Sequence, residues 1–94
     1  FATNILSDNT AALTLTNIHR TIINTGAATT YTLPVASTCR GREYVIANHG
    51  TGTITFATAV RVANGVTITT LSNVAGTNNI TIQSDGTTWV KTSN

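Results

Sequence analysis

Charge is scarce in this 94-residue chain, because Asp, Glu, Lys and Arg together make up only 9% of it. Five basic residues stand against three acidic ones, which gives a formal net charge of +2. The basic residues are spread along the chain, whereas nucleic-acid-binding proteins usually gather Lys and Arg on one face. We therefore expect no nucleic acid among the partners of this protein.

Cysteine and long apolar runs are also rare or missing. The one cysteine, Cys39, has no partner for an intrachain disulfide and forms no Cys spacing typical of a metal site. No apolar run reaches the length of about 18 residues that a membrane-spanning helix needs, and no signal-peptide pattern occurs. We therefore expect no membrane insertion. The start at Phe1 instead of Met predicts a fragment processed from a longer polypeptide.

Threonine is the most abundant residue, and Asn and Gly recur between the apolar segments. Thr is β-branched and favours pleated strands, whereas Asn and Gly favour turns. These features predict an all-β fold, an antiparallel short-strand sandwich or barrel-like module, in which residues 1–17 lead into a single β domain over 18–94. The expected strands cover residues 12–16, 20–25, 29–33, 43–48, 53–57, 60–63, 66–70, 79–83 and 87–92.

Two dipeptides predict hairpin turns. Asp85-Gly86 and Asn64-Gly65 each lie between alternating apolar and polar residues, and Gly accepts the positive φ of tight turns. Trp89 follows the first of these turns. Because a lone Trp in a strand more often fills a core than faces solvent, we expect Trp89 in the core.

Neighbouring apolar residues at Ile22-Ile23 and Val45-Ile46 point to opposite faces of their strands. Such strands are expected to be covered on both sides. A chain of this length buries only about 60–65% of its unfolded surface, so its own core is thin. The second cover is therefore expected to come from another copy of the protein.

The sequence offers little catalytic chemistry. The acidic residues are Asp8, Glu43 and Asp85; turns account for the two aspartates and a solvated strand end for Glu43, so we expect no carboxylate pair. The histidines, His19 and His49, lack metal-ligand spacing. We expect no enzyme activity, no cofactor and no metal; the alternative is three copies of one His gathered on a trimer axis, which would form a metal or anion site.

Polar, Asn-rich loops suit sugar recognition, because amides both donate and accept hydrogen bonds with hydroxyl groups. An aromatic ring adds a platform on which a sugar stacks. The predicted receptor-binding surface consists of Tyr44, His49, Asn64, Asn73, Asn78 and Asn79.

Four segments in this order resemble a module of tailed-bacteriophage tail fibres, spikes and other virion appendages. They are TTYTLP (29–34), GREYVIAN (41–48), GTIT (52–55) and SDGTTWV (84–90), and the similarity extends over roughly residues 18–92. The resemblance implies a β-rich homotrimer on an extracellular-facing part of the virion, which contributes to host attachment or to fibre trimerisation. It implies a bacterial surface polysaccharide or protein as receptor and other fibre segments as further partners. It supplies no catalytic residue.

Two alternatives stay open at this point. In the first, the chain is a trimerisation or folding module of a fibre and makes no receptor contact. In the second, it is an accessory module of a polysaccharide depolymerase.

Overall fold

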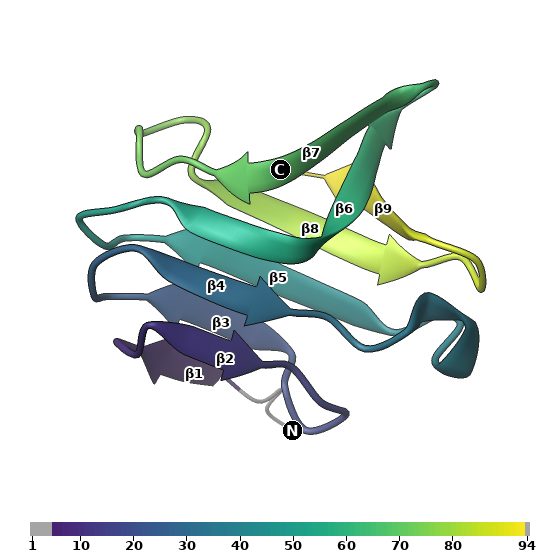
Figure 1. Ribbon diagram of the computed structural model, residues 1–94, viewed down its shortest axis with the longest axis horizontal. Coiled ribbons are helices and arrows are strands. Elements are labelled where there is room, and N and C mark those ends of the chain that lie inside the picture. The colour runs from purple at the N-terminus through teal and green to yellow at the C-terminus, as the bar shows by residue number, and fades with distance from the viewer. Residues whose placement is uncertain (1–4, 94) are drawn as a thin grey trace.

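The computed structural model describes residues 5–93, and nearly all of its regular structure is β. Figure 1 shows the elements in chain order. The first four residues of the N-terminal segment expected over 1–17 lie outside the described part. The elements are β1 (Ile5–Asp8), β2 (Ala12–Thr14), β3 (Thr21–Asn24), β4 (Thr29–Thr32), the 3-10 turn η1 (Ala36–Thr38), β5 (Glu43–Asn48), β6 (Ile54–Ala63), β7 (Val66–Leu71), β8 (Asn79–Ser84) and β9 (Trp89–Ser93).

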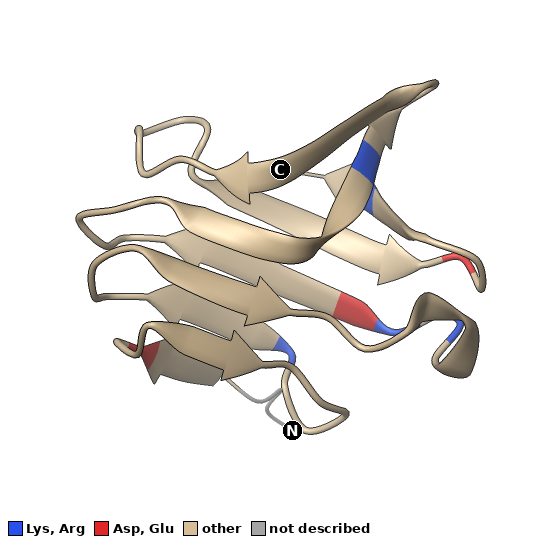
Figure 2. Ribbon diagram, viewed as in Figure 1, with Lys and Arg blue, Asp and Glu red and all other residues tan. Residues whose placement is uncertain are grey.

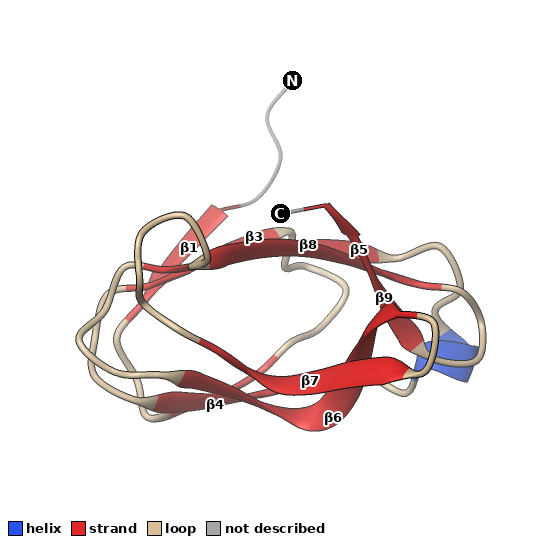
Figure 3. Ribbon diagram, turned by 90° about the horizontal axis from the view of Figure 1, so that it is seen from above, coloured by secondary structure: helices blue, strands red, loops and turns tan. Residues whose placement is uncertain are grey.

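The strands form one sheet that curls into a half-barrel with two facing layers (Figure 3). The neighbours along the sheet are β1-β3-β5-β8-β9-β6-β4-β2, and β7 pairs with β6. One layer holds β1, β3, β5 and β8, and the other holds β2, β4, β6 and β7. β9 joins the two layers, because it pairs with β8 on one side and with β6 on the other.

The first six strands coil in three stacked turns, which we call rungs: β1-β2, β3-β4 and β5-β6. Within each layer the strands of successive rungs pair in parallel. From β1 to β6 the chain crosses from one layer to the other after each strand, so these four parallel pairs are joined through the opposite layer. The antiparallel strands β7 and β8, with β9, follow the third rung.

The all-β class is therefore confirmed, whereas the expected antiparallel arrangement is wrong for most of the sheet. Five of the eight strand pairings in the described chain are parallel, and three are antiparallel. The reason is the coiling. Sequence alternation reports which face of a strand is buried, but it does not report the direction of the neighbouring strand.

The core lies between the layers and contains every aromatic ring of the described residues. Trp89, Tyr44, Tyr31 and Phe56 are at most 2% exposed. The Trp89 and Tyr44 rings lie 5.4 Å apart between centroids. The Trp89 indole Nε1 donates a hydrogen bond of 2.9 Å to the carbonyl of Pro34. Trp89 thus closes the core beside the loop that follows β4, as expected from the sequence.

The two strands expected to be covered on both faces are β3 and β5. Ile22 and Ile46 are fully buried between the layers. Ile23 and Val45 point to the outer face of the same layer and are only partly buried. Within one described chain, residues 5–93 do not cover this outer face completely.

The hairpins form where the sequence predicts them, with one difference in length. β6 and β7 pair across Asn64-Gly65, and Gly65 has a φ of +72°. β8 and β9 also pair, but four residues, Asp85–Thr88, join them instead of the dipeptide alone. Asp85 N donates to Thr88 O at 3.1 Å, which closes this wider loop.

Candidate functional site

Buried polar residues hold the rungs together where each one turns between layers. Asp8, Asn24 and Asn48 end β1, β3 and β5 and lie next to one another in register. All three are buried. The Asn24 amide Nδ2 donates to Asn48 Oδ1 at 3.0 Å. We call this edge of the molecule the turn side.

Each of the two amides also fixes the loop that follows it. Asn24 Oδ1 accepts a 3.2 Å hydrogen bond from Gly26 N, and Asn48 Oδ1 accepts one of 3.2 Å from Gly50 N. The residue two positions after each Asn is a glycine because space is tight. A Cβ on Gly50 would lie 2.6 Å from Asn24 Nδ2. The exposed tips of these loops are thereby held in fixed positions.

The loop between β7 and β8 packs against the same turn side. Asn73 Nδ2 donates to Gly50 O at 3.1 Å, and Asn78 Nδ2 donates to Asn48 O at 3.2 Å. Asn48 N donates in turn to Asn78 O at 2.7 Å. These contacts join residues far apart in the sequence and place the third rung beside residues 72–78.

The structure brings together four of the six residues predicted to bind a receptor. His49, Asn73, Asn78 and Asn79 lie on the turn side or at its border with β8, and His49, Asn73 and Asn79 are exposed. The Tyr44 ring is fully buried, and its hydroxyl donates to Thr16 O at 2.9 Å. Tyr44 therefore offers no ring surface to a ligand, because its place in β5 faces the core.

A cavity of about 350 Å³ opens between β7 in one layer and β8 in the other, next to β9, which joins the layers. We call it the β7–β8 cleft. The cleft exists because β7 pairs only with β6 in the described chain, which leaves the other edge of β7 without a neighbouring strand over the core. Its lining residues are Val62, Ile68, Thr70, Leu71, Ser72, Thr77, Asn79, Ile80 and Lys91.

A second cavity of about 290 Å³ adjoins the cleft where β6 and β9 separate. The two cavities share Val62 and Lys91. Asn64 lines this second cavity, so two predicted residues, Asn64 and Asn79, reach adjoining hollows from different loops. Sequence reasoning missed Lys91, because the one lysine of the chain carries no local motif; only the pairing of β9 places it here.

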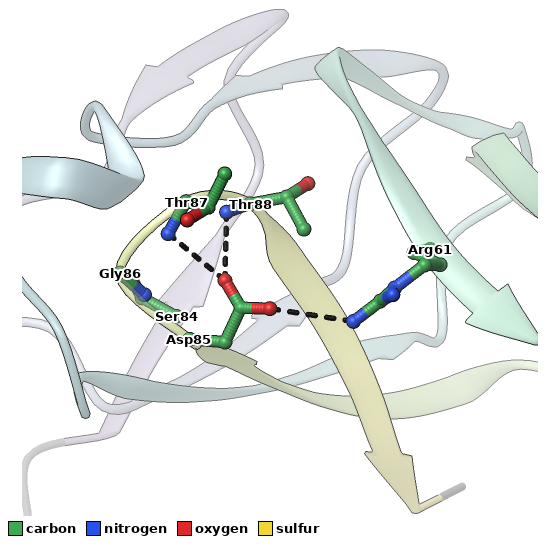
Figure 4. A network of polar contacts seen from close by, with 6 residues as sticks. All are labelled: Arg61, Ser84, Asp85, Gly86, Thr87 and Thr88. Atoms are coloured by element: carbon green, nitrogen blue, oxygen red, sulfur yellow. Dashed lines mark hydrogen bonds and ion pairs between the residues drawn. The ribbon is translucent and has the colours of Figure 1, made fainter.

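The hairpin next to these cavities holds an ordered carboxylate (Figure 4). Asp85 Oδ1 accepts hydrogen bonds from Thr88 N at 2.8 Å and Thr87 N at 2.9 Å, and Asp85 Oδ2 lies 3.3 Å from the Arg61 guanidinium. The two backbone hydrogen bonds, with Arg61 and Arg40 adding smaller effects, lower the pKa of Asp85. Asp85 is thus a turn residue, as expected.

The other charged groups lie away from the cleft. Glu43 pairs with Arg20 at 2.6 Å, and Asp8 is buried on the turn side. Figure 2 shows most charged segments towards one end of the strands. Within residues 5–93, no three His, Cys, Asp or Glu side chains gather as a metal site would require.

No known protein family, curated protein or solved structure is detectably similar to this chain. Among the described residues there is no helix of the length and apolar character that would cross a membrane.

Proposed function

We propose that this chain is a non-enzymatic attachment module of a tailed-bacteriophage fibre or spike, exposed on the virion, and that it binds a glycan of the bacterial surface. The observation that carries the proposal is the β7–β8 cleft. It lies beside the Asn-rich loops whose chemistry suggested sugar binding, and Asn79 lines it.

The cleft has the mixture of surfaces that a sugar requires. Its partly exposed apolar residues, Val62 and Ile68, offer contact to the C–H faces of a sugar ring. The side-chain hydroxyl of Thr70 and the side-chain amide of Asn79 make no hydrogen bond within the described chain, so both are free for ligand hydroxyl groups. A volume of about 350 Å³ lies at the small end of the roughly 300–1,000 Å³ typical of ligand sites.

Competition for host cells tests this proposal. The isolated chain is expected to block adsorption of a phage that carries it, and Thr70→Ala combined with Asn79→Ala is expected to weaken the block at least tenfold. Thr30→Ala is the matched control, because Thr30 is exposed on β4 outside the cleft. Equal blocking by the double variant and the unchanged chain would contradict the role of the cleft.

We also infer that the module assembles as a homotrimer. The outer face of β3 and β5 carries Ile23 and Val45, which one chain leaves partly exposed. Closed cyclic assemblies bury such faces between identical copies. Light scattering is expected to give three times the 9.8 kDa mass of one chain. A mass of 9.8 kDa at all concentrations would overturn the inference.

A trimerisation module without receptor contact is the second candidate, and one observation favours it. The amides of Asn73 and Asn78 donate to backbone carbonyls, so these two predicted binding residues already serve the fold. A stable trimer that never blocks adsorption would support this alternative. An accessory role in a polysaccharide depolymerase would instead require that the parent polypeptide carries the catalytic domain.

A further inference from the structure

We propose that the β7–β8 cleft and the adjoining cavity bind a carboxylated sugar, and that Lys91 is the residue that pairs with its carboxylate. The inference rests on the proposed function, in which a glycan occupies this cleft, and it adds the chemical class of that glycan.

The position of Lys91 is the first argument. Lys91 lies on β9 opposite Ile82 of β8, and it lines both cavities. Trp89, two residues earlier in β9, is 1% exposed and anchors the strand in the core. Lys91 is partly buried and forms neither an ion pair nor a side-chain hydrogen bond within residues 5–93. Lys91 thus lines the junction of the cavities without a charged partner among the described residues.

The charge of the lining residues is the second argument. The two cavities are lined by Lys91 and Arg61 but by no acidic residue. Asp85, which pairs with Arg61, is held by two backbone N–H groups in its own turn. Because Asp85 pairs with Arg61, the uncompensated positive charge of the lining is that of Lys91. In a partly buried hollow, such a charge attracts an anion more strongly than it would on an open surface.

The uncharged lining indicates which kind of anion fits. Apolar contact comes from residues such as Ile68, and hydrogen-bonding groups come from Thr70, Ser72 and Asn79. No aromatic residue lines either cavity, so a nucleotide base would have no stacking partner. A phosphate group is usually held by several N–H groups or by bidentate Arg, whereas one ammonium group matches one carboxylate.

Two bacterial sources carry this chemistry. Uronic acids occur in surface polysaccharides, and ulosonic acids occur in lipid-linked cores; both present one carboxylate on a polyhydroxylated ring. The probes are therefore digalacturonic acid for the first source, 3-deoxy-manno-octulosonic acid for the second, and neutral galactobiose as the uncharged counterpart.

Titration calorimetry of the full chain with each probe tests the inference. At least one acidic probe is expected to bind ten or more times more tightly than galactobiose, and the difference is expected to shrink as salt is added. Lys91→Gln is expected to remove this preference, and Lys91→Arg to keep most of it. Arg40→Gln is the matched control, because Arg40 is exposed and lines neither cavity.

Each outcome decides one of the two proposals. Equal binding of acidic and neutral probes, or an unchanged preference in Lys91→Gln, would overturn the carboxylate inference. Absence of binding to all three probes would overturn it as well. If the chain then still blocks host adsorption and Thr70→Ala with Asn79→Ala abolishes the block, the proposed attachment through the cleft stands. Buried Trp89 reports by its fluorescence that each variant is folded.

Discussion

At the scale of single residues, the buried amide of Asn48 connects three parts of the chain. Its Nδ2 donates to Gly52 O at 2.8 Å and to Leu71 O at 3.0 Å, and its Oδ1 accepts from Asn24 and Gly50. Asn48→Ala removes all four of these hydrogen bonds, and those with Asn24 and Leu71 lie in the buried interior. We expect a loss of about 2–4 kcal/mol in the free energy of unfolding, measured by urea titration.

Asn9→Ala is the control for this variant, because Asn9 occupies an exposed position on the same turn side. We expect it to change the unfolding free energy by less than about 0.5 kcal/mol. Similar losses in both variants would contradict the role assigned to the buried amide.

The core tyrosines predict how stability changes in alkaline solution. Burial is the largest cause that raises the pKa of Tyr31 and of Tyr44 above the ordinary value of 10.0, and the nearby Asp8 carboxylate adds to the effect on Tyr31. Because their pKa is raised in the folded state, the tyrosines contribute fully to the free energy of unfolding below pH 10.0. This contribution falls above pH 10.0, since tyrosine in the unfolded chain ionises first.

We therefore expect the thermal midpoint to fall as the pH rises above about 10, and Tyr31→Phe to reduce the steepness of that fall. Circular dichroism melts between pH 8 and pH 11.5 measure both. An equally steep fall in Tyr31→Phe would show that other groups control alkaline unfolding.

At the scale of elements, the approach of neighbouring rungs depends on Gly50. Its position leaves no room for a side chain, because an added Cβ would meet Gly26 O and lie 2.6 Å from Asn24 Nδ2. Gly50→Ala must push the second and third rungs apart. We expect a loss of about 2–4 kcal/mol by urea titration, against a change near zero for exposed Thr51→Ala. A small loss of unfolding free energy in Gly50→Ala would contradict this account, because it would mean that the loops on the turn side can move apart at little cost.

The β8–β9 hairpin predicts an acid response. The hydrogen bonds from Thr88 and Thr87 lower the pKa of Asp85, so its contribution to stability is present above the ordinary Asp pKa. It is lost as the pH falls through the lowered pKa of the folded state. Asp85→Asn is expected to lower the thermal midpoint at pH 7, and its difference from the unchanged chain is expected to vanish at low pH. A difference that persists in acid would contradict this account.

The sequence allowed most elements to be predicted but not their arrangement. β5 has the predicted bounds, because a clean run from Glu43 to Asn48 is framed by turn residues. The expected strands 53–57 and 60–63 form one strand, β6, since an irregularity in its pairing replaces the expected break. β1 was not among the expected strands. β1 consists of two apolar residues followed by two polar ones, and it becomes a strand through parallel pairing with β3, which no local pattern reports.

The candidate site was predictable only in part for the same reason. Loop chemistry pointed to Asn79 and Asn64, which line the cavities. The sequence predicts Tyr44 as an aromatic platform, but alternation in β5 alone does not say which of its faces meets the core. The rungs also escape detection as a sequence repeat, because the connection after β4, which contains η1, is longer than the one after β2.

At the scale of the whole molecule, the two broad outer faces differ in character. On one layer, Ala12, Thr30 and Thr55 form an exposed row across β2, β4 and β6, which ends at Thr70 of β7 on the border of the β7–β8 cleft. On the other layer, Ile23 and Val45 give the middle of the face an aliphatic surface that is already partly desolvated. Further burial of this second face costs few polar contacts, so it is the face we expect between copies in the proposed trimer.

Val45→Lys tests that expectation. A charge in the middle of the aliphatic face would have to be buried without a partner in the assembled trimer, whereas in a single chain it can extend into water. We expect light scattering to show dissociation to single chains with little change in the circular dichroism spectrum. Thr55→Lys places the same charge on the threonine row and is expected to leave the assembly intact. If Thr55→Lys dissociates the assembly and Val45→Lys does not, the interface lies on the threonine row, because the new charge separates copies only where they meet.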